Sequence, residues 1–195
     1  MANLDRPAGF KPVKHLSGAP WNGKANVYYI PSTDATTTFI GDAVKSAGSA
    51  DATGMYPTVQ QATAAANIRG VIIGFGLSPE LMMNPDNPNM KYRAASTAMY
   101  CLVVDDPGVI FEIQEDSADN TITAAMVGLS TDIVVGSGST TTGKSGMELD
   151  SSDTATALGQ CKILRAVNRP DNALGDYCKW EVLIIEHEML AATDV

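Results

Sequence analysis

The stretch "GSGSTTTGKSG" at residues 136–146 separates two fold classes for this chain. Read from Gly138, it fits the phosphate-loop pattern, with Gly143, Lys144 and Ser145 in the remaining defining positions. In a working phosphate loop, backbone N–H groups hold phosphate at the start of a helix, within a parallel sheet that has crossover helices. A helix directly after Ser145 would therefore indicate an α/β nucleotide-binding fold.

The residues after Ser145 do not have the pattern of a helix. They read "GMELDSSDTATALGQ" (146–160), a glycine followed by many Asp, Ser and Thr residues. These residue types favour turns and caps over helix interiors. Met147 and Leu149 alternate with polar residues, which is strand spacing, and the carboxylates of this run would repel a triphosphate. The stretch is therefore interpreted as a surface or contact loop, and no nucleotide or other cofactor is expected.

The rest of the chain has the pattern of about ten short strands, separated by turn signals every 8 to 15 residues or so. This spacing predicts an all-β domain of jelly-roll or β-sandwich-like form over residues 26–195, with under about 15% helix. Residues 78–93 hold three prolines and three asparagines and are expected to form a loop. Residues 120–129 fit a strand or one short helical turn. The expected strands lie within 26–30, 36–48, 56–63, 68–77, 97–104, 109–115, 131–136, 156–167 and 178–187.

Residues 1–25 are expected to form an extended N-terminal arm. Their three prolines oppose a helix, and the segment lacks the paired alternating runs of a hairpin. Several large apolar side chains nonetheless need a surface to cover them. That surface is either the arm's own domain or a neighbouring subunit. If it is a partner, the contact residues are Phe10, Pro12, Val13, Leu16 and Trp21.

The charge of the chain restricts its partners. The net charge is −9 and only 18% of the residues are charged. An acidic protein is a poor ligand for nucleic acid or for anionic membrane surfaces, and no apolar run reaches the ~20 residues that span a bilayer. The first residues do not resemble a signal peptide. Three widely spaced cysteines indicate a reducing compartment, with each thiol in an apolar strand.

No catalytic or metal-binding set emerges from the sequence. His187 lies in "EHE", but on a strand its two glutamate neighbours point to the other face, so the three cannot chelate one ion. His187 is expected at an exposed strand end. The acidic pairs near Asp105 and Glu115 match no calcium loop. The chain is therefore predicted not to be an enzyme. The alternative that stays open is a carbohydrate-binding or carbohydrate-active β-sandwich protein.

Several stretches together resemble the head decoration, or cement, proteins of tailed bacteriophages. They are "RPAGFKPV" (6–13), "YYIPSTDATTTFIGDAVKSAGSAD" (28–51), "IRGVIIGF" (68–75), "TGKSGMELDSS" (142–152) and "LGQCKILRAVNRPDNALGDYCKWEVLIIEHE" (158–188). The resemblance implies a β-rich fold and a protein made in the host cytoplasm. It also implies attachment to the major capsid protein on the outside of the shell, as a symmetric oligomer. A homotrimer is slightly favoured over a homodimer, because shells offer many threefold and quasi-threefold joints.

Overall fold

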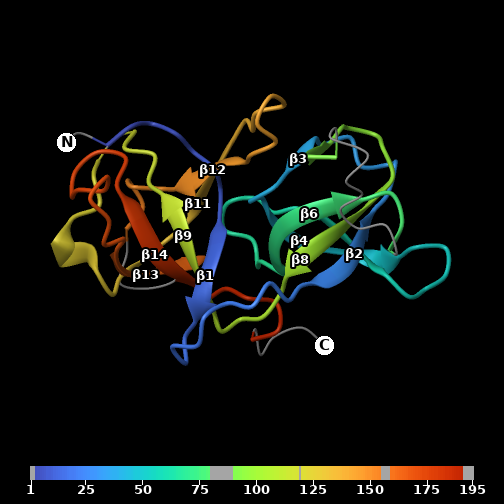
Figure 1. The fold of residues 1–195 in the computed structure, drawn as a ribbon, viewed down its shortest axis with the longest axis horizontal. Helices are drawn as coiled ribbons and strands as arrows, with labels where there is room; N and C mark the ends of the chain where they lie inside the picture. The colour runs from blue at the N-terminus through green and yellow to red at the C-terminus, as the bar shows by residue number, and fades with distance from the viewer. Residues whose placement is uncertain (1–2, 80–89, 119, 155–158, 191–195) are drawn as a thin grey trace.

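The computed structural model of the protein describes residues 3–79, 90–118, 120–154 and 159–190, and it consists of two β-lobes side by side (Figure 1). The first lobe is a closed five-stranded barrel with the strand order β2-β5-β4-β6-β8. All of its pairs are antiparallel except β2 with β5. Its strands are β2 (Asn26–Ile30), β4 (Ala43–Ala50), β5 (Pro57–Gln61), β6 (Gly70–Gly76) and β8 (Met99–Val104).

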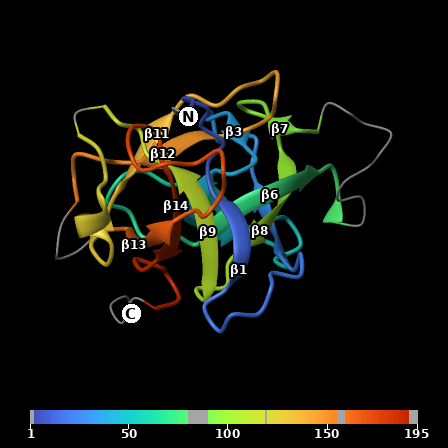
Figure 2. The same ribbon diagram turned by 60° about the vertical axis from the view of Figure 1, so that its left-hand side comes forward.

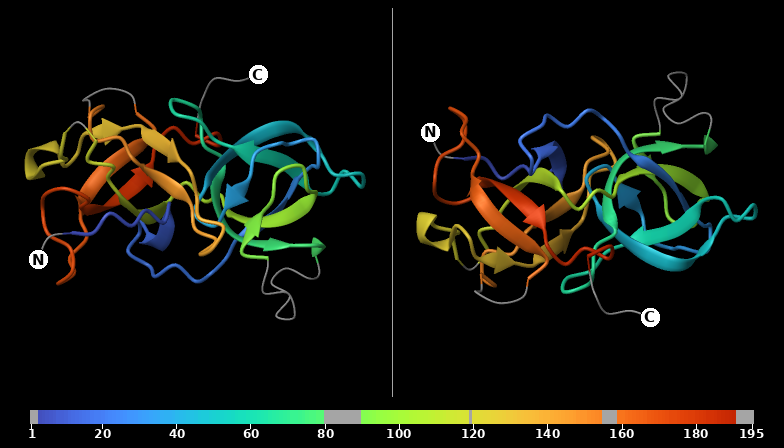
Figure 3. Two further views of the ribbon diagram at one scale, coloured as in Figure 1. Left: turned by 90° about the horizontal axis from the view of Figure 1, so that it is seen from above. Right: turned by 90° about the horizontal axis from the view of Figure 1, so that it is seen from below.

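The second lobe is built on a five-stranded antiparallel sheet with the order β1-β9-β14-β13-β10. An isolated bridge between Glu115 and Leu149 joins the end of β9 to a separate hairpin, so the lobe curls around its core (Figure 3). The sheet strands are β1 (Lys11–His15), β9 (Val109–Gln114), β10 (Ser130–Thr131), β13 (Cys161–Ala166) and β14 (Lys179–Ile184). The hairpin strands are β11 (Ile133–Gly136) and β12 (Gly146–Leu149), and a short pair joins β3 (Thr38–Phe39) to β7 (Tyr92–Arg93).

Alternating side chains supply a separate core to each lobe. In β14, Trp180, Val182 and Ile184 are buried in the second lobe, while the residues between them are partly exposed. This is the two-residue period of a strand with one buried face. β6 is buried on both faces, because Ile72 packs in the barrel core and Val71 packs in the core of the second lobe. The two lobes therefore meet across a shared apolar contact.

The N-terminal segment is part of the second lobe. β1 pairs with β9, and Phe10 is only 2% exposed, with its ring 5.8 Å from Phe111 in an edge-to-face arrangement. A bridge between Lys14 and Pro20 also folds residues 14–20 back on themselves, which differs from the expectation that the segment forms no hairpin. The prolines permit this because a sheet edge strand does not need every N–H group. The described part of the segment therefore contributes strand β1 to the sheet and covers its own domain.

The all-β, sandwich-like fold class is confirmed. The three-residue 3-10 turn η2 (Ala124–Met126) falls inside the stretch 120–129 expected to be a strand or a helical turn. Residues 80–89 of the expected loop 78–93 lie outside the described residues, and 92–93 form β7. The strand pattern did not indicate a division into two lobes. In the described part of the chain, no helix has the length and apolar character needed to cross a membrane.

Candidate partner-binding face and interlobe pocket

The outer face of the five-stranded sheet gathers charged side chains. Strand register pairs Lys11 with Glu112, Glu112 with Glu181, and Glu181 with Arg165, and residues paired across strands project to the same side. Figure 2 shows β1, β9 and β14 side by side. Arg169, in the loop after β13, reaches Glu112 from beyond the sheet. We call this surface the basic face, after its cations Lys11, Lys14, Lys162, Arg165, Arg169 and Lys179.

Ion pairs hold the centre of the basic face in a fixed arrangement. The Nζ of Lys14 lies 2.9 Å from Glu181 Oε2, and the Nε of Arg165 lies 2.8 Å from the same oxygen. Burial raises the pKa of Glu181, but the hydrogen bonds from Lys14 and Arg165 outweigh it, so the net pKa lies below its ordinary value. Arg169 Nη1 donates to both carboxylate oxygens of Glu112, at 2.9 and 3.0 Å. Two carboxylates are thus shared among three cations.

The basic face has the opposite charge balance to the rest of the protein. Its six cations are accompanied by Glu112, Glu181 and, at the margin, Asp171, which pairs with Arg169. The whole chain has 13 basic and 22 acidic residues, so seven basic and 19 acidic residues lie elsewhere. Asp5 and Glu148 border the face where they contact Gln114. A local excess of positive charge on an acidic protein favours association with an acidic surface.

The five contact residues expected in the N-terminal segment have different environments. Phe10 is in the core, so its side chain is closed to a partner, and Pro12 is half-buried opposite Phe111. Val13 and Leu16 are exposed, at 37% and 60%. The register shifts between Pro12 and Lys14, which places Val13 in a bulge and reverses the direction of the side chains that follow. This irregularity is why the apolar pattern alone did not separate inward from outward residues.

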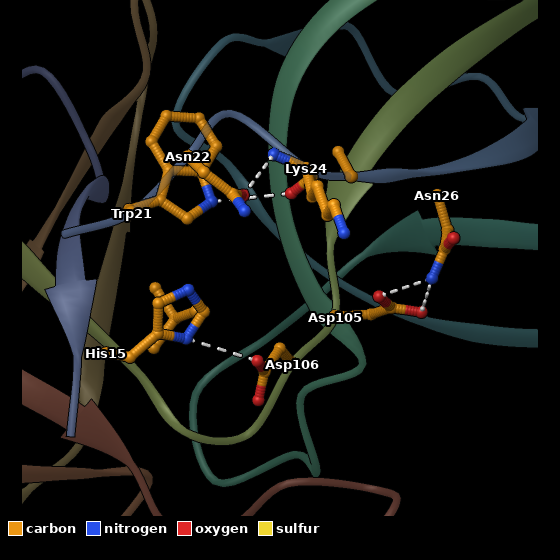
Figure 4. A pocket seen from close by; sticks show the side chains of 9 residues that line it. His15, Trp21, Asn22, Lys24, Asn26, Asp105 and Asp106 are labelled. Carbon is orange, nitrogen blue, oxygen red and sulfur yellow. Dashed lines mark hydrogen bonds and ion pairs between the residues drawn. The ribbon is translucent and has the colours of Figure 1, made fainter. Parts of the chain in front are cut away.

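Trp21, the last of these residues, forms a wall of a polar pocket of about 440 Å³ between the lobes (Figure 4). The indole Nε1 donates to the carbonyl oxygen of Lys24 at 3.3 Å, which fixes the ring. Across the pocket, Asp105 accepts hydrogen bonds from Asn26 at 2.8 and 3.1 Å. The remaining polar lining comes from His15, Asn22 and Asp106.

The stretch 136–146 is a hairpin loop, and the predicted absence of a helix after it is confirmed. Strand β12 begins at Gly146, directly after Ser145. The loop N–H groups are used internally: Ser139 N donates to Lys144 O at 2.9 Å, and Gly143 N donates to Ser139 O at 2.7 Å. Ser145 N donates to Ile40 O at 2.9 Å, in the segment that leads from β3 to the barrel. The first two donors close the loop on itself and the third holds it against the other lobe, so none of the three is free to bind phosphate.

His187 is buried, and the expectation of an exposed strand end is therefore wrong. His187 is 1% exposed. Its backbone forms a parallel bridge with Ile68, so this part of the chain lies against the barrel lobe. Burial lowers the pKa of His187, and the nearby charge of Arg69 lowers it further. Across the described ranges, no group of three or more His, Cys, Asp or Glu residues could hold a metal ion.

The three cysteines are buried, as expected for small core hydrophobes. Burial raises the pKa of all three thiols, that of Cys178 to about 11. Each thiol is therefore in its unreactive, protonated form at neutral pH. None of the three is positioned as a nucleophile.

Two glutamates of the second lobe have strongly raised pKa values. Burial raises the pKa of Glu115 to about 7, although its carboxylate accepts hydrogen bonds from the backbone N–H groups of Ile122 and Cys178 at 2.7 and 3.3 Å. Burial also raises the pKa of Glu148 to about 7, and the negative charges of Asp5 and Asp116 add to the effect. The second lobe therefore carries carboxyl groups that titrate close to neutral pH.

The protein is expected to be more stable at pH 5 than at pH 8. The pKa of Glu115 is higher in the folded state than its ordinary 4.5. The contribution of this group to the free energy of unfolding is therefore complete below about pH 4.5 and is lost as the pH rises through about 7. For this fully buried group the loss is of the order of 2–3 kcal/mol. Urea unfolding between pH 4.5 and 8 measures it. Glu115→Gln should flatten the slope, whereas Asp153→Asn, at an exposed position, should leave it unchanged.

Comparison with known proteins does not assign a family. No protein-family model, curated protein or solved structure matches this chain. The basic face and the interlobe pocket are the two surface features of this protein that are suited to binding a partner or a ligand.

Proposed function

We propose that this protein is a structural virion protein, which binds the outside of a shell of major capsid protein and stabilises it. The observation that carries the proposal is the basic face, a solvent-exposed sheet surface on an acidic protein, with exposed Val13 and Leu16 in its edge strand and the turn that follows. Surfaces with charged groups and a few apolar side chains are suited to protein partners. The resemblance to head decoration proteins implies that the partner is the major capsid protein. It also implies that the protein is made in the host cytoplasm and then attaches to the outer surface of the capsid.

The basic face is suited to a stabilising role because it is rigid before binding. β1 is held by its pairing with β9 and by the burial of Phe10, and the ion pairs of Glu181 fix side chains in the middle of the sheet. A preorganised surface loses little conformational entropy on binding. Assembly as a homotrimer, or as a homodimer, would let one particle hold several shell subunits and add avidity.

Reversing charge on the basic face is expected to weaken binding to the shell. Among the described residues, neither Lys162 nor Lys179 forms a salt bridge, so their replacement breaks none of the ion pairs of the basic face. The double variant Lys162→Glu and Lys179→Glu should lower the affinity for shells that lack the protein by about tenfold or more, about 1.4 kcal/mol. Adding Leu16→Asp should lower it further. Co-sedimentation at physiological ionic strength measures the effect, which should shrink as salt is added.

The matched control changes the net charge equally at other places. Lys45, on barrel strand β4, and Lys144, in the loop between β11 and β12, can be replaced by Glu together. This control should bind shells as the unaltered protein does. Equal binding by all variants, with their melting temperatures unchanged, would contradict the proposed contact face. Failure of the unaltered protein to bind any shell of its source phage would overturn the capsid role itself.

A further inference from the structure

The interlobe pocket lies where the chain passes between the two lobes. One wall comes from residues 15–26, which lead from β1 into barrel strand β2, and the other from residues 105–109, which lead from β8 back to β9. Its volume of about 440 Å³ is in the range of small-molecule sites, which often lie at the junction of two structural units. The pocket does not depend on the basic face or on the proposed capsid role.

The two carboxylates of the pocket are fixed by interactions within the protein. Asp105 accepts hydrogen bonds from Asn26 and, at 2.7 Å, from Tyr28 Oη, and it lies 3.6 Å from Arg69. Asp106 accepts the backbone N–H of Gly108 at 2.8 Å. Such prearranged groups offer remaining lone pairs to a ligand without the cost of ordering flexible side chains.

Two donors and one ring nitrogen of the pocket are not used inside the described part of the protein. The Nδ1 atom of His15 lies 3.3 Å from Asp106, and the Nε2 atom of that ring has no partner among the described residues. The side-chain amide of Asn22 accepts from Lys24 N at 3.2 Å, but its NH₂ group has no partner there. The ammonium of Lys24 is likewise unpaired in the described ranges. Donors and acceptors therefore stand together next to an indole ring (Figure 4).

The mixture of groups identifies the chemistry of the ligand. An anion would be repelled by Asp105 and Asp106, and a cation would be repelled by Lys24 and the nearby Arg69. An apolar ligand would leave these polar groups unpaired, which is costly. An uncharged ring with many hydroxyl groups can pair with both the hydrogen-bond donors and the acceptors of the pocket, because each hydroxyl group donates and accepts. Its C–H groups can also pack on the electron-rich face of Trp21.

We propose that the pocket between the lobes binds a neutral sugar residue, with Trp21 as the stacking surface and with Asn22, Lys24 and Asp106 bonding to its hydroxyl groups. For a protein on a virion surface, such a site would attach particles to glycans. The ligand class follows from the pocket residues alone. Sugar binding and shell binding are therefore separate properties of the protein.

Tryptophan fluorescence provides a direct test. The chain has two tryptophans, and Trp180 is fully buried in the core, so a change on adding sugar reports on Trp21. The probes are a glycan array, followed by titration with the methyl glycosides of glucose, galactose, mannose and N-acetylglucosamine. We expect a saturable change with at least one of them, little affected by salt. Asn22→Ala should weaken sugar binding by about tenfold. Trp21→Ala removes the fluorescent reporter, so its sugar binding is measured by calorimetry, and it should be abolished.

Matched variants and competing ligands decide the outcome. Leu16 belongs to the segment 15–26 but does not itself line the pocket, so Leu16→Asp should leave sugar binding unchanged while it weakens binding to shells. Inorganic phosphate and arginine amide are the charged probes. The proposal is overturned if either charged probe gives the saturable change while the sugars do not. It is equally overturned if no glycan on the array binds, or if Trp21→Ala binds sugar as the unaltered protein does while it remains folded.

Discussion

Replacing Arg93 with methionine is expected to lower the free energy of unfolding by about 3–5 kcal/mol. Arg93 is fully buried, and its guanidinium donates to four backbone carbonyl oxygens. Methionine would fill much of the volume but leave those acceptors unpaired in the interior. The contacts are with the oxygens of Thr97 at 2.6 Å, Thr36 at 2.7 Å, Asp34 at 2.7 Å and Pro31 at 2.9 Å.

The fork geometry of Arg93 explains why no other cation can replace it. One planar group holds both the loop after β2 and the loop after β7, so it closes one end of the barrel. Arg93→Lys should therefore recover only a small part of the loss. Arg165→Met is the control, since Arg165 is 59% exposed and its removal should cost under about 1 kcal/mol. Urea unfolding compares the three variants, and similar losses for Arg93→Met and Arg165→Met would contradict this role.

Replacing Gly9 with alanine is expected to release the N-terminal segment from the second lobe. Gly9 has a φ of +66°, and an added Cβ would lie 2.3 Å from the carbonyl oxygen of Gly41 and 2.5 Å from Ser145 Cβ. That oxygen also accepts the N–H of Phe10 at 2.9 Å, so the clash breaks the contact that seats the segment. The conformational penalty and the overlap together should cost about 3–5 kcal/mol.

Gly18→Ala is the matched control for Gly9→Ala. Gly18 also has a positive φ, +89°, but an added Cβ would meet nothing within 4 Å. It should therefore cost only about 1 kcal/mol, the conformational penalty alone. Thermal unfolding measures the loss, and limited proteolysis followed by mass spectrometry should show cleavage within residues 3–21 for Gly9→Ala only. Equal melting temperatures for the two variants would show that the close approach to Gly41 does not hold the segment.

The different roles of Gly9 and Gly18 could not be predicted from the sequence of this segment. Both glycines lie in the same proline-rich stretch, and the sequence around them does not show which one is closely approached by other parts of the chain. Gly9 is indispensable only because Gly41 and Ser145 arrive beside it from other parts of the chain. The same holds for Arg93, whose acceptors lie mainly in the loop after β2.

The fold class of this protein follows from local features of its sequence. The alternation of buried and exposed residues in β14, the glycine and small polar residues after Ser145, and the prolines near the N-terminus each act over a few residues. Strand periodicity, helix termination and proline geometry are local properties, so they could be read without knowing any partner. They argued against a phosphate loop and predicted most of the strands, although β1 and β7 fall in segments that were expected to be an extended arm and a loop.

The positions of the basic face and of the interlobe pocket depend on contacts between distant parts of the chain. The basic face depends on the register of β1, β9, β13 and β14, and a shift of one residue would move its cations to the other side of the sheet. The bulge at Val13 decides which apolar side chains of the N-terminal segment reach solvent. The pocket exists because residues 15–26 and 105–109 cross between the lobes at one place. Strand pairing between distant segments is set by burial and register across the whole molecule, which no local pattern encodes.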